Sequence, residues 1–218
     1  MIFAPGIADE ILKRSPGSLF PMKCTKIAYR ARKGQQMPPS PWKTLSSRYV
    51  LRDRWMTLRA DRCETASGIV VDPYYVQEPE DWAQVVAFDT EDRILVIRQY
   101  RHGAKAIFTE LPCGGIEQGE PPAQAAAREL LEETGCVADT LQPLPVLSPN
   151  PARYSNHIYT FIGTGTRQVQ KQQLDVTEDI EFEFLTIPAV LSLIDTGSFS
   201  QALHVGGLFL ALRSRGLE

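Results

Sequence analysis

The chain has 218 residues, of which 43% are hydrophobic and 22% charged, and it carries a formal net charge of −3. This length is enough for one globular core with additions, and the mildly acidic balance excludes a general affinity for nucleic acid. No apolar run approaches the roughly 18 residues that a membrane-spanning helix needs, so we expect neither nucleic acid nor a membrane as a partner. The four cysteines lack metal-binding spacing, which favours reduced thiols in a cytoplasmic protein.

Residues 1–36 differ in composition from the rest of the chain. They contain seven Lys and Arg residues against two acidic residues, have little hydrophobic periodicity and are interrupted by prolines. Such a segment is typical of a flexible leader, and it has no continuous apolar region followed by a cleavage motif. Met22 and Met37 are alternative start sites. We predict a dispensable leader that ends near residue 36.

The region from residue 42 to residue 101 is rich in alternating apolar and polar residues, a pattern that predicts β-strands. We expect residues 37–80 to form an N-terminal β subdomain and residues 81–218 to form the main domain. The last two strands of the region are expected to pair as a hairpin across a turn at 89–92. The predicted strands are 47–51, 55–61, 69–71, 74–76, 82–88 and 93–101.

A helix is predicted to begin at the two prolines Pro121 and Pro122 and to end at Gly135. Proline suits the first turn of a helix, where backbone N–H groups have no intrahelical partner. Four alanines follow, and alanine has the highest helix propensity. Glycine is the usual residue at a helix C-terminus.

The last two turns of this helix are acidic on one side. Glu129, Glu132 and Glu133 are three or four residues apart, so their side chains lie on neighbouring positions. Carboxylates near the negative end of the helix dipole cost about 0.3–1 kcal/mol each, and Arg128 can pair only with some of them. This arrangement favours a site for Mg²⁺, with Mn²⁺ as a substitute, over an ordinary solvated surface.

The C-terminal part alternates strands and then helices. Strands are predicted at 141–147, 157–162 and 181–186, and helices at 188–195 and 202–213. Strands, one helix, further strands and closing helices predict an α/β/α sandwich with a mixed β-sheet.

Residues 114–136 resemble the Nudix box, G-x5-E-x7-R-E-U-x-E-E-x-G-U, in which U is aliphatic. Only the last position departs, because Cys136 occupies it. The segments 98–103, 110–115 and 198–211 extend the similarity to the branch that hydrolyses ADP-ribose and nucleoside diphosphate sugars. The residues on the letters of the box are Gly114, Glu120, Arg128, Glu129, Leu130, Glu132, Glu133 and Gly135.

This resemblance implies the Nudix-type α/β/α sandwich and a Mg²⁺-dependent hydrolase of a small nucleoside diphosphate derivative. It also implies a homodimer, because the N-terminal β subdomain of this branch commonly pairs or swaps between subunits. The products would be a nucleoside monophosphate and a sugar phosphate. ADP-ribose and hexose substrates such as GDP-mannose or GDP-glucose both remain open. Alternatives are a hydrolase of dinucleoside polyphosphates, an isomerase and a non-catalytic ligand-binding sensor.

The resemblance also implies a set of metal ligands. Glu129 and Glu133 would be the main ligands, and Glu132 and Glu120 would assist. The backbone carbonyl of Cys113 would be another ligand, while its thiol is expected to have no nucleophilic role. Glycine at 114 and 115 lets the loop direct its groups toward one point. Arg128 is expected to orient Glu132 rather than contact the substrate.

The remaining candidates are the general base and the substrate contacts. Glu178, as a metal ligand or base, is the first choice for an acidic residue from a later loop, and Asp175 is the reserve. Arginine binds phosphate oxygens in a bidentate manner. The candidate substrate contacts are Arg98 and Arg101 for the diphosphate, Glu110 for a ribose hydroxyl or metal-bound water, and Trp42 or Trp55 for stacking on a base.

Overall fold

The computed structural model describes residues 39–217, and the predicted leader at 1–36 lies outside them. The described chain forms two compact units. The first consists of residues 39–79 with 150–155, and the second of residues 80–149 with 156–217. We call them the N-terminal unit and the main unit.

The N-terminal unit is a three-stranded antiparallel sheet in the order β1-β2-β3. The segment 150–155 adds to the end of β3, where Gln77 donates its N–H to the carbonyl of Arg153 at 2.8 Å. We expected two separate strands around Asp72-Pro73, but β3 runs through both. The proline is tolerated because β3 lies at the sheet edge, at a register shift opposite Arg62. The strands are β1 (Lys43–Arg52), β2 (Thr57–Glu64) and β3 (Val70–Gln77).

Large apolar side chains are exposed on this sheet and its loops. Ala60 and Cys63 of β2 are buried, whereas nearly every residue of β1 is exposed. Large exposed apolar patches on a folded protein often mark sites of interaction with a partner. The exposed apolar residues are Trp42, Tyr49, Val50, Leu51, Trp55, Met56, Ile69, Val70 and Tyr75.

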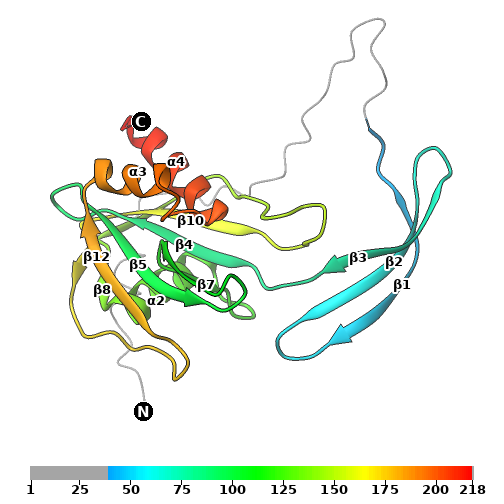
Figure 1. The fold of residues 1–218 in the computed structure, drawn as a ribbon, viewed down its shortest axis with the longest axis horizontal. Coiled ribbons are helices and arrows are strands. Elements are labelled where there is room, and N and C mark those ends of the chain that lie inside the picture. Colours follow the sequence, from blue (N-terminus) through cyan, green and yellow to red (C-terminus); the bar gives the residue numbers. More distant parts are fainter. Residues whose placement is uncertain (1–38, 218) are drawn as a thin grey trace, which may run out of the picture. The chain divides into compact units, whose positions relative to one another are not determined.

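The main unit contains two larger sheets (Figure 1). One has the order β7-β4-β10-β9 and is mixed, because β4 and β10 are parallel while the other pairs are antiparallel. The other has the order β12-β5-β6 and is antiparallel. The bounds are β4 (Trp82–Ala87), β5 (Ile94–Arg101), β6 (Ala106–Glu110), β7 (Cys113–Gly115), β9 (Thr140–Pro143), β10 (Ile158–Thr164) and β12 (Ile180–Leu185).

Helices cover both sides of these sheets (Figure 1). On one side, α2 (Pro122–Thr134) contributes Ala125, Ala126 and Leu130 to a core with β4, β5 and β10. On the other side, α3 (Ile187–Asp195) and α4 (Ala202–Arg215) pack in a second core against the opposite faces of the same strands. The predicted α/β/α arrangement with a mixed sheet is therefore confirmed. Within residues 39–217, none of the helices has the length and apolar character needed to cross a membrane.

Further local expectations were wrong. The predicted hairpin of 82–88 and 93–101 exists only at its turn, where Phe88 and Ile94 form an isolated bridge. Beyond it, β4 pairs with β7 and β10 while β5 pairs with β6 and β12, because alternation does not identify the partner of a strand. The strand expected at 141–147 ends at Pro143. Gly114 and Gly115 were expected in a loop but belong to strand β7, because they pair with β4. Neither β6 nor the short pair β8 (Cys136–Val137) and β11 (Arg167–Gln168) was predicted.

Candidate active site

Helix α2 forms as its sequence predicts. Pro121 is the N-cap in an extended conformation, and Gly135 is the C-cap in the left-handed region with φ 68°. The N–H of Gly135 donates to the carbonyl of Leu131 at 2.8 Å. The apolar side of the helix is buried in the core, so its acidic side faces β7 and the loops.

Glu133 is the most deeply buried carboxylate on this helix, with 3% of its surface exposed. Its Oε2 accepts the backbone N–H of Cys113 in β7 at 2.9 Å. Burial raises the pKa of Glu133 well above its usual range, and this single hydrogen bond offsets the effect only in part. The helix therefore holds a desolvated carboxyl group against β7, the strand that contains Gly114 and Gly115.

Glu129 lies one turn earlier, directly over Gly114. A Cβ at position 114 would overlap the carboxyl group of Glu129, so this close approach requires glycine. Burial raises the pKa of Glu129 despite an ion pair with Arg128 at 2.6 Å. Glu129 and Glu133 are thus two carboxyl groups that the fold makes costly to ionise.

Arg128 pairs with the other carboxylates of the box. Its guanidinium pairs with Glu120 at 2.9 Å and Glu132 at 3.1 Å, and it donates to the carbonyl of Gly115 at 2.9 Å. These hydrogen bonds lower the pKa of Glu120. Arg128 contacts Glu132, as expected, and also holds Glu120 and the end of β7 against the helix.

The loop before β12 carries Asp175 and Glu178. The N–H of Asp175 donates to Glu178 Oε2 at 3.0 Å, and the N–H of Glu178 donates to the carbonyl of Asp175 at 2.9 Å. The charge of Glu178 acts to raise the pKa values of both Glu129 and Glu133. Glu178 is therefore within electrostatic range of Glu129 and Glu133, while Asp175 is exposed. The role of either loop residue as ligand or base stays a prediction.

Arg101 and Glu110 form an ion pair between β5 and β6. The closest approach is 2.5 Å between Arg101 Nη2 and Glu110 Oε2, and the carboxyl group of Glu110 is buried. Burial alone would lower the pKa of Arg101, but the hydrogen bonds and charge of Glu110 outweigh it and raise the pKa. The charge of Arg101 also stabilises ionised Glu133, so the pair belongs to the same electrostatic environment as α2.

Arg98 is not brought to this group. It lies three residues before Arg101 on a regular strand, so its side chain projects from the opposite face. There it pairs with Glu183 at 2.6 Å and Glu181 at 3.1 Å. A role for Arg98 in substrate binding stays a prediction.

The two candidate stacking residues belong to the N-terminal unit. Trp42 packs edge-on against Tyr74 with ring centroids 5.8 Å apart, and Arg54 lies over the ring of Trp55 at 4.0 Å. Both indoles are substantially exposed, Trp55 by 78%. They are available for stacking, and that role also stays a prediction.

Three polar residues near the site were not among the predicted site residues. Glu80 lies over the glycine loop, where a Cβ on Gly115 would be 3.0 Å from its Oε2. His204 of α4 is buried, accepts the N–H of Leu111 at 3.4 Å and lies 4.0 Å from Glu110. Burial lowers the pKa of His204 to about 3. The third residue, Gln172, contacts the end of α2, and only the folded chain shows its position.

The donor set of this site fits a divalent cation. Among residues 39–217, no three His, Cys, Asp or Glu side chains are already arranged around a single metal position. However, Glu129 and Glu133 are desolvated and have raised pKa values, with Glu178 near both. Hard oxygen ligands of this kind suit Mg²⁺ or Mn²⁺, whose charge would offset the cost of ionising them. The thiol of Cys113 is buried with a raised pKa, so it stays neutral.

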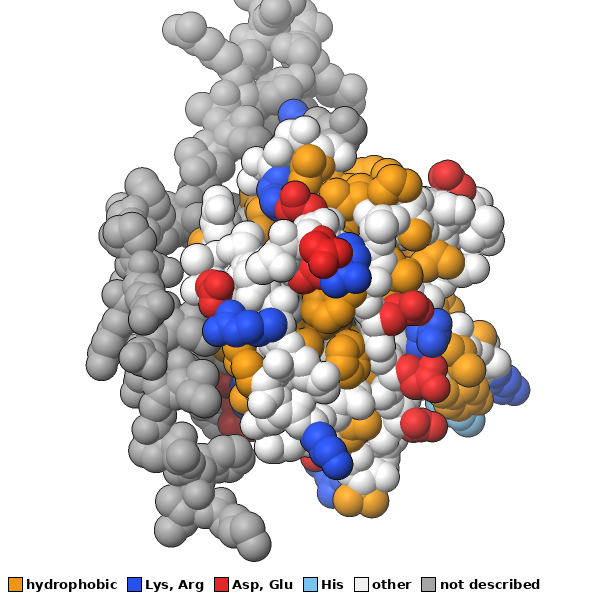
Figure 2. Space-filling model, turned by 90° about the vertical axis from the view of Figure 1, so that its left-hand side faces the viewer, with side chains coloured by type: hydrophobic (Ala, Val, Ile, Leu, Met, Phe, Trp, Pro, Cys, Tyr) orange, Lys and Arg blue, Asp and Glu red, His pale blue; other side chains and the backbone are white. Residues whose placement is uncertain are grey.

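The surface carries mixed charges. On the described part of the face in Figure 2, basic side chains lie beside acidic ones and form no extended basic patch. The ion pairs of Arg98 and of Arg93 with Asp89 at 2.7 Å have the same character.

An α/β/α sandwich with a helix that presents buried carboxylates behind a glycine loop is the architecture of a Nudix enzyme. The NUDIX domain model matches residues 81–202, and the model of the nucleoside diphosphate sugar hydrolase N-terminal domain matches residues 42–77. The chain belongs to the Nudix family, and the expected Nudix pyrophosphohydrolase is thereby confirmed at the level of the enzyme class.

Individual proteins agree with this assignment. The chain is 29% identical over 174 residues to an ADP-ribose pyrophosphatase of Mycobacterium tuberculosis, covering 79% of this chain and 84% of the relative. It is 26% identical over 155 residues to an ADP-ribose pyrophosphatase of Bacillus subtilis, covering 71% and 83%. The crystal structure of an ADP compounds hydrolase shares the fold with a TM-score of 0.74 at 24% identity, covering 84% of this chain and all of that one.

Proposed function

We propose that this enzyme hydrolyses the diphosphate bond of a nucleoside diphosphate linked to a sugar, with ADP-ribose as the first substrate to test. The products are a nucleoside monophosphate and a sugar phosphate. The relatives named ADP-ribose pyrophosphatase support this choice, and the match of residues 42–77 to a nucleoside diphosphate sugar hydrolase domain supports the wider class. Hexose substrates such as GDP-mannose stay in the proposal as the alternative.

The observation that carries the proposal is the pair of carboxyl groups on α2, of which Glu133 is buried and Glu129 is partly buried. A buried carboxylate without a paired cation costs several kcal/mol, and the fold keeps Glu133 with only one hydrogen bond from Cys113. Buried ionisable groups of this kind are typical of functional sites, where a bound ligand offsets the cost of their charge. The complement of that site is a cation together with an anionic substrate.

The proposed cofactor is Mg²⁺, with Mn²⁺ as a substitute. Glu129 and Glu133 would hold it, with the carbonyl of Cys113 and the carboxylates of Glu120, Glu132 and Glu178 as further ligands. When bound, such an ion neutralises diphosphate charge and lowers the pKa of a coordinated water. Arg128 pairs with Glu120, Glu129 and Glu132, so these three ligands would exchange part of that pairing for the ion.

The protein groups divide the remaining work. Arg101, held by Glu110 at 2.5 Å, presents the outer part of its guanidinium to a diphosphate oxygen. Glu178 accepts a proton from the attacking water, with Asp175 as the alternative base. Both groups are positioned before substrate arrives, which reduces the entropic cost of the reaction.

We further propose that the enzyme is a cytoplasmic homodimer formed through the N-terminal unit. The exposed apolar side chains of β1 and the β2–β3 loop support such an interface. Trp42 and Trp55 would then lie at or beside it, where flat rings can stack on a base. The three described cysteines, Cys63, Cys113 and Cys136, are free thiols, which supports a reducing compartment.

The test is product formation from ADP-ribose, GDP-mannose, GDP-glucose, UDP-glucose and a dinucleoside polyphosphate, each with Mg²⁺ and with Mn²⁺. The proposal predicts the highest kcat/KM for one of the nucleoside diphosphate sugars, with a nucleoside monophosphate as product. A preference for the dinucleoside polyphosphate would replace the proposed substrate class. Release of inorganic phosphate alone would contradict the proposed bond.

A further inference from the structure

The carboxyl end of α2 is capped by a segment that lies far from it in the sequence. The last carbonyls of a helix have no partner within the helix, and they carry the partial negative charge of the helix dipole. The segment 169–173, which follows β11, supplies N–H groups to this end. Val169 and Gln170 both donate to the carbonyl of Gly135, at 2.9 and 3.2 Å, and Gln173 donates to the carbonyl of Glu132 at 2.9 Å.

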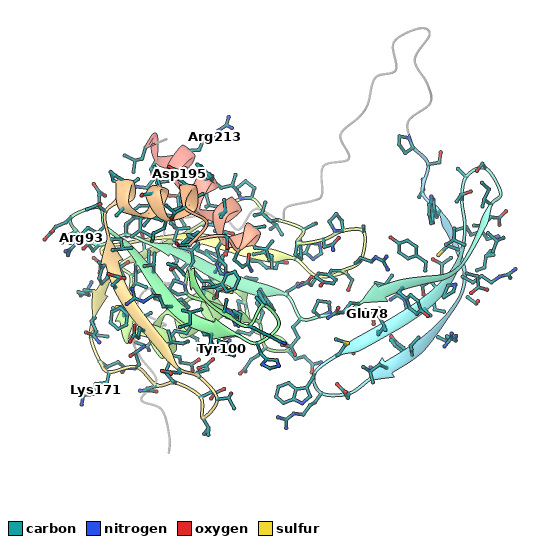
Figure 3. All side chains as sticks on the ribbon, in the orientation of Figure 1. Glu78, Arg93, Tyr100, Lys171, Asp195 and Arg213 are labelled. Atoms are coloured by element: carbon teal, nitrogen blue, oxygen red, sulfur yellow. The ribbon has the colours of Figure 1, made fainter. Side chains whose placement is uncertain are left out.

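The close approach of this segment depends on Gly135. A Cβ at that position would overlap the backbone carbonyl of Gln170, and φ is already in the left-handed region. The helix end and the segment are therefore in backbone contact. Lys171, in the middle of the segment, projects outward with its side chain exposed (Figure 3).

Gln172 adds the one side-chain link in this contact. Its Nε2 donates to the carbonyl of Glu133 at 2.6 Å and to the carbonyl of Ile180 at 2.9 Å. Glu133 lies in the last turn of α2, and Ile180 is the first residue of β12. The loop 173–179, which carries Glu178, is thus closed at its base by one amide that also holds the metal-binding helix.

We infer that Gln172 is a positioning residue that fixes the loop of Glu178 against Glu129 and Glu133. The loop 173–179 leads into β12 beside the end of α2, so holding Glu178 near these two carboxyl groups takes an attachment that joins both elements. Two hydrogen bonds from one side chain to two elements provide it. The part of this inference that concerns catalysis rests on the proposed function of Glu178.

The residue type at position 172 follows from the two acceptors. Both are carbonyl oxygens, so the side chain must donate two hydrogen bonds from one end, which the amide nitrogen of glutamine does. Methionine has a similar length but no donor. Glutamate would place a carboxylate against two carbonyl oxygens and the negative helix end.

The experiment compares Gln172→Met and Gln172→Glu with Gln173→Met in the full chain. Gln173 is a matched control, because its side chain is exposed and makes no hydrogen bond with residues 39–217. Hydrogen exchange of the amides at 174–179 is measured without metal, Mn²⁺ affinity by electron paramagnetic resonance, and kcat and KM with ADP-ribose. Melting temperatures verify that all variants fold.

We expect exchange of the loop amides to accelerate about tenfold in Gln172→Met, the factor that corresponds to one or two lost hydrogen bonds. Affinity for Mn²⁺ should fall, kcat should fall about tenfold, and KM should stay within about twofold. Gln172→Glu should show larger effects of the same kind, and Gln173→Met should resemble the wild type. Loop exchange in Gln172→Met that equals the control would overturn the inference, whatever the activity.

A double-mutant cycle separates positioning from a general structural effect. If Gln172 acts through Glu178, then Gln172→Met should reduce kcat much less in a Glu178→Gln background than in the wild type. Equal, additive losses in both backgrounds would overturn the positioning role. An inactive wild type whose loop still responds to Gln172→Met would contradict the proposed function while supporting the structural coupling.

Discussion

The two units of this protein differ in which side chains lie in an unfavourable environment. In the main unit, apolar residues are buried in two cores, and the costly groups are carboxylates such as Glu129 and Glu133. In the N-terminal unit, polar groups are exposed or paired, and the costly groups are apolar side chains such as Val50 and Ile69. Buried charge is relieved by a cation, whereas exposed apolar area is relieved by a protein partner.

This difference suggests that catalysis and assembly can be perturbed separately. Substitutions at the buried carboxylates should change turnover without changing the oligomeric state. Substitutions on the N-terminal sheet should change the oligomeric state while leaving metal binding intact.

The largest effect is expected for Glu133→Gln. The substitution removes the charge of a proposed metal ligand but keeps the size of the side chain, so kcat should fall about a thousandfold, or roughly 4 kcal/mol of activation free energy. Steady-state kinetics of ADP-ribose hydrolysis measure this. Glu183→Gln is the control, because Glu183 is a partly exposed carboxylate paired with Arg98 on the opposite face of the sheet. Near-normal turnover of Glu133→Gln would remove the proposed metal site.

Arg101 and Arg98 provide a second contrast on the same strand. Arg101→Lys should raise KM about tenfold or more, because lysine cannot reproduce a bidentate contact to phosphate oxygens while paired with Glu110. Arg98→Lys should change KM less than about threefold, because its guanidinium lies with Glu181 and Glu183 on the opposite face. KM values from initial rates decide between them. A larger effect of Arg98→Lys would restore Arg98 as the clamp.

Assembly should respond to Val50→Asp. This change puts a charge into the exposed apolar surface of β1 and should weaken the dimer by about tenfold or more. Phe209→Asp in α4 is the matched control, since Val50 and Phe209 are 46% and 44% exposed. Sedimentation equilibrium over a range of concentrations measures both. A chain that is monomeric without any substitution would contradict the proposed interface.

A smaller effect is expected in the pH dependence of stability without metal. The raised pKa of Glu133 means that the folded state retains a proton that the unfolded state releases. Its contribution is therefore complete below the usual pKa of a glutamate and is lost as pH rises toward the folded-state pKa, with a slope of up to about 1.4 kcal/mol per pH unit. Denaturant unfolding in EDTA between pH 6.5 and 8 should show stability falling with pH.

The choice of pH range avoids opposing groups. The lowered pKa of His204, about 3, contributes stability that is lost as pH falls below about 6.5, and the lowered pKa values of Glu120 and Asp61 act at lower pH still. Glu133→Gln should reduce the slope between pH 6.5 and 8. An identical slope in the wild type and Glu133→Gln would mean that Glu133 is not the group that retains the proton.

The smallest effect is expected for deletion of residues 1–36. We propose that this basic segment is a dispensable leader, so kcat and KM should remain within about twofold of the full chain. Kinetics of the two proteins side by side measure this. A loss of turnover would make the segment part of the working enzyme.

The sequence predicted those features that depend on local pattern. The limits of α2 follow from its prolines and Gly135, and the clustering of Glu129 and Glu133 follows from helical spacing. The fold class followed from the order of elements together with the family motif. These expectations need no knowledge of which strands pair.

Features that depend on long-range pairing were not predictable in this way. The separation of β4 and β5 into two sheets depends on strands that come later in the chain. Arg98 and Arg101 project from opposite faces of β5. Only the fold shows which of these faces α2 covers, and therefore which arginine lies near the site. Gln172 lies in a polar run without any motif, and its two acceptors, at Glu133 and Ile180, belong to elements that only the fold brings together.

The most direct test of the central claim is product analysis of ADP-ribose hydrolysis by the metal-free protein before and after addition of Mg²⁺. The buried carboxylates predict no turnover in EDTA, and release of AMP with ribose 5-phosphate once Mg²⁺ is added. Equal turnover in EDTA would contradict the metal-dependent account.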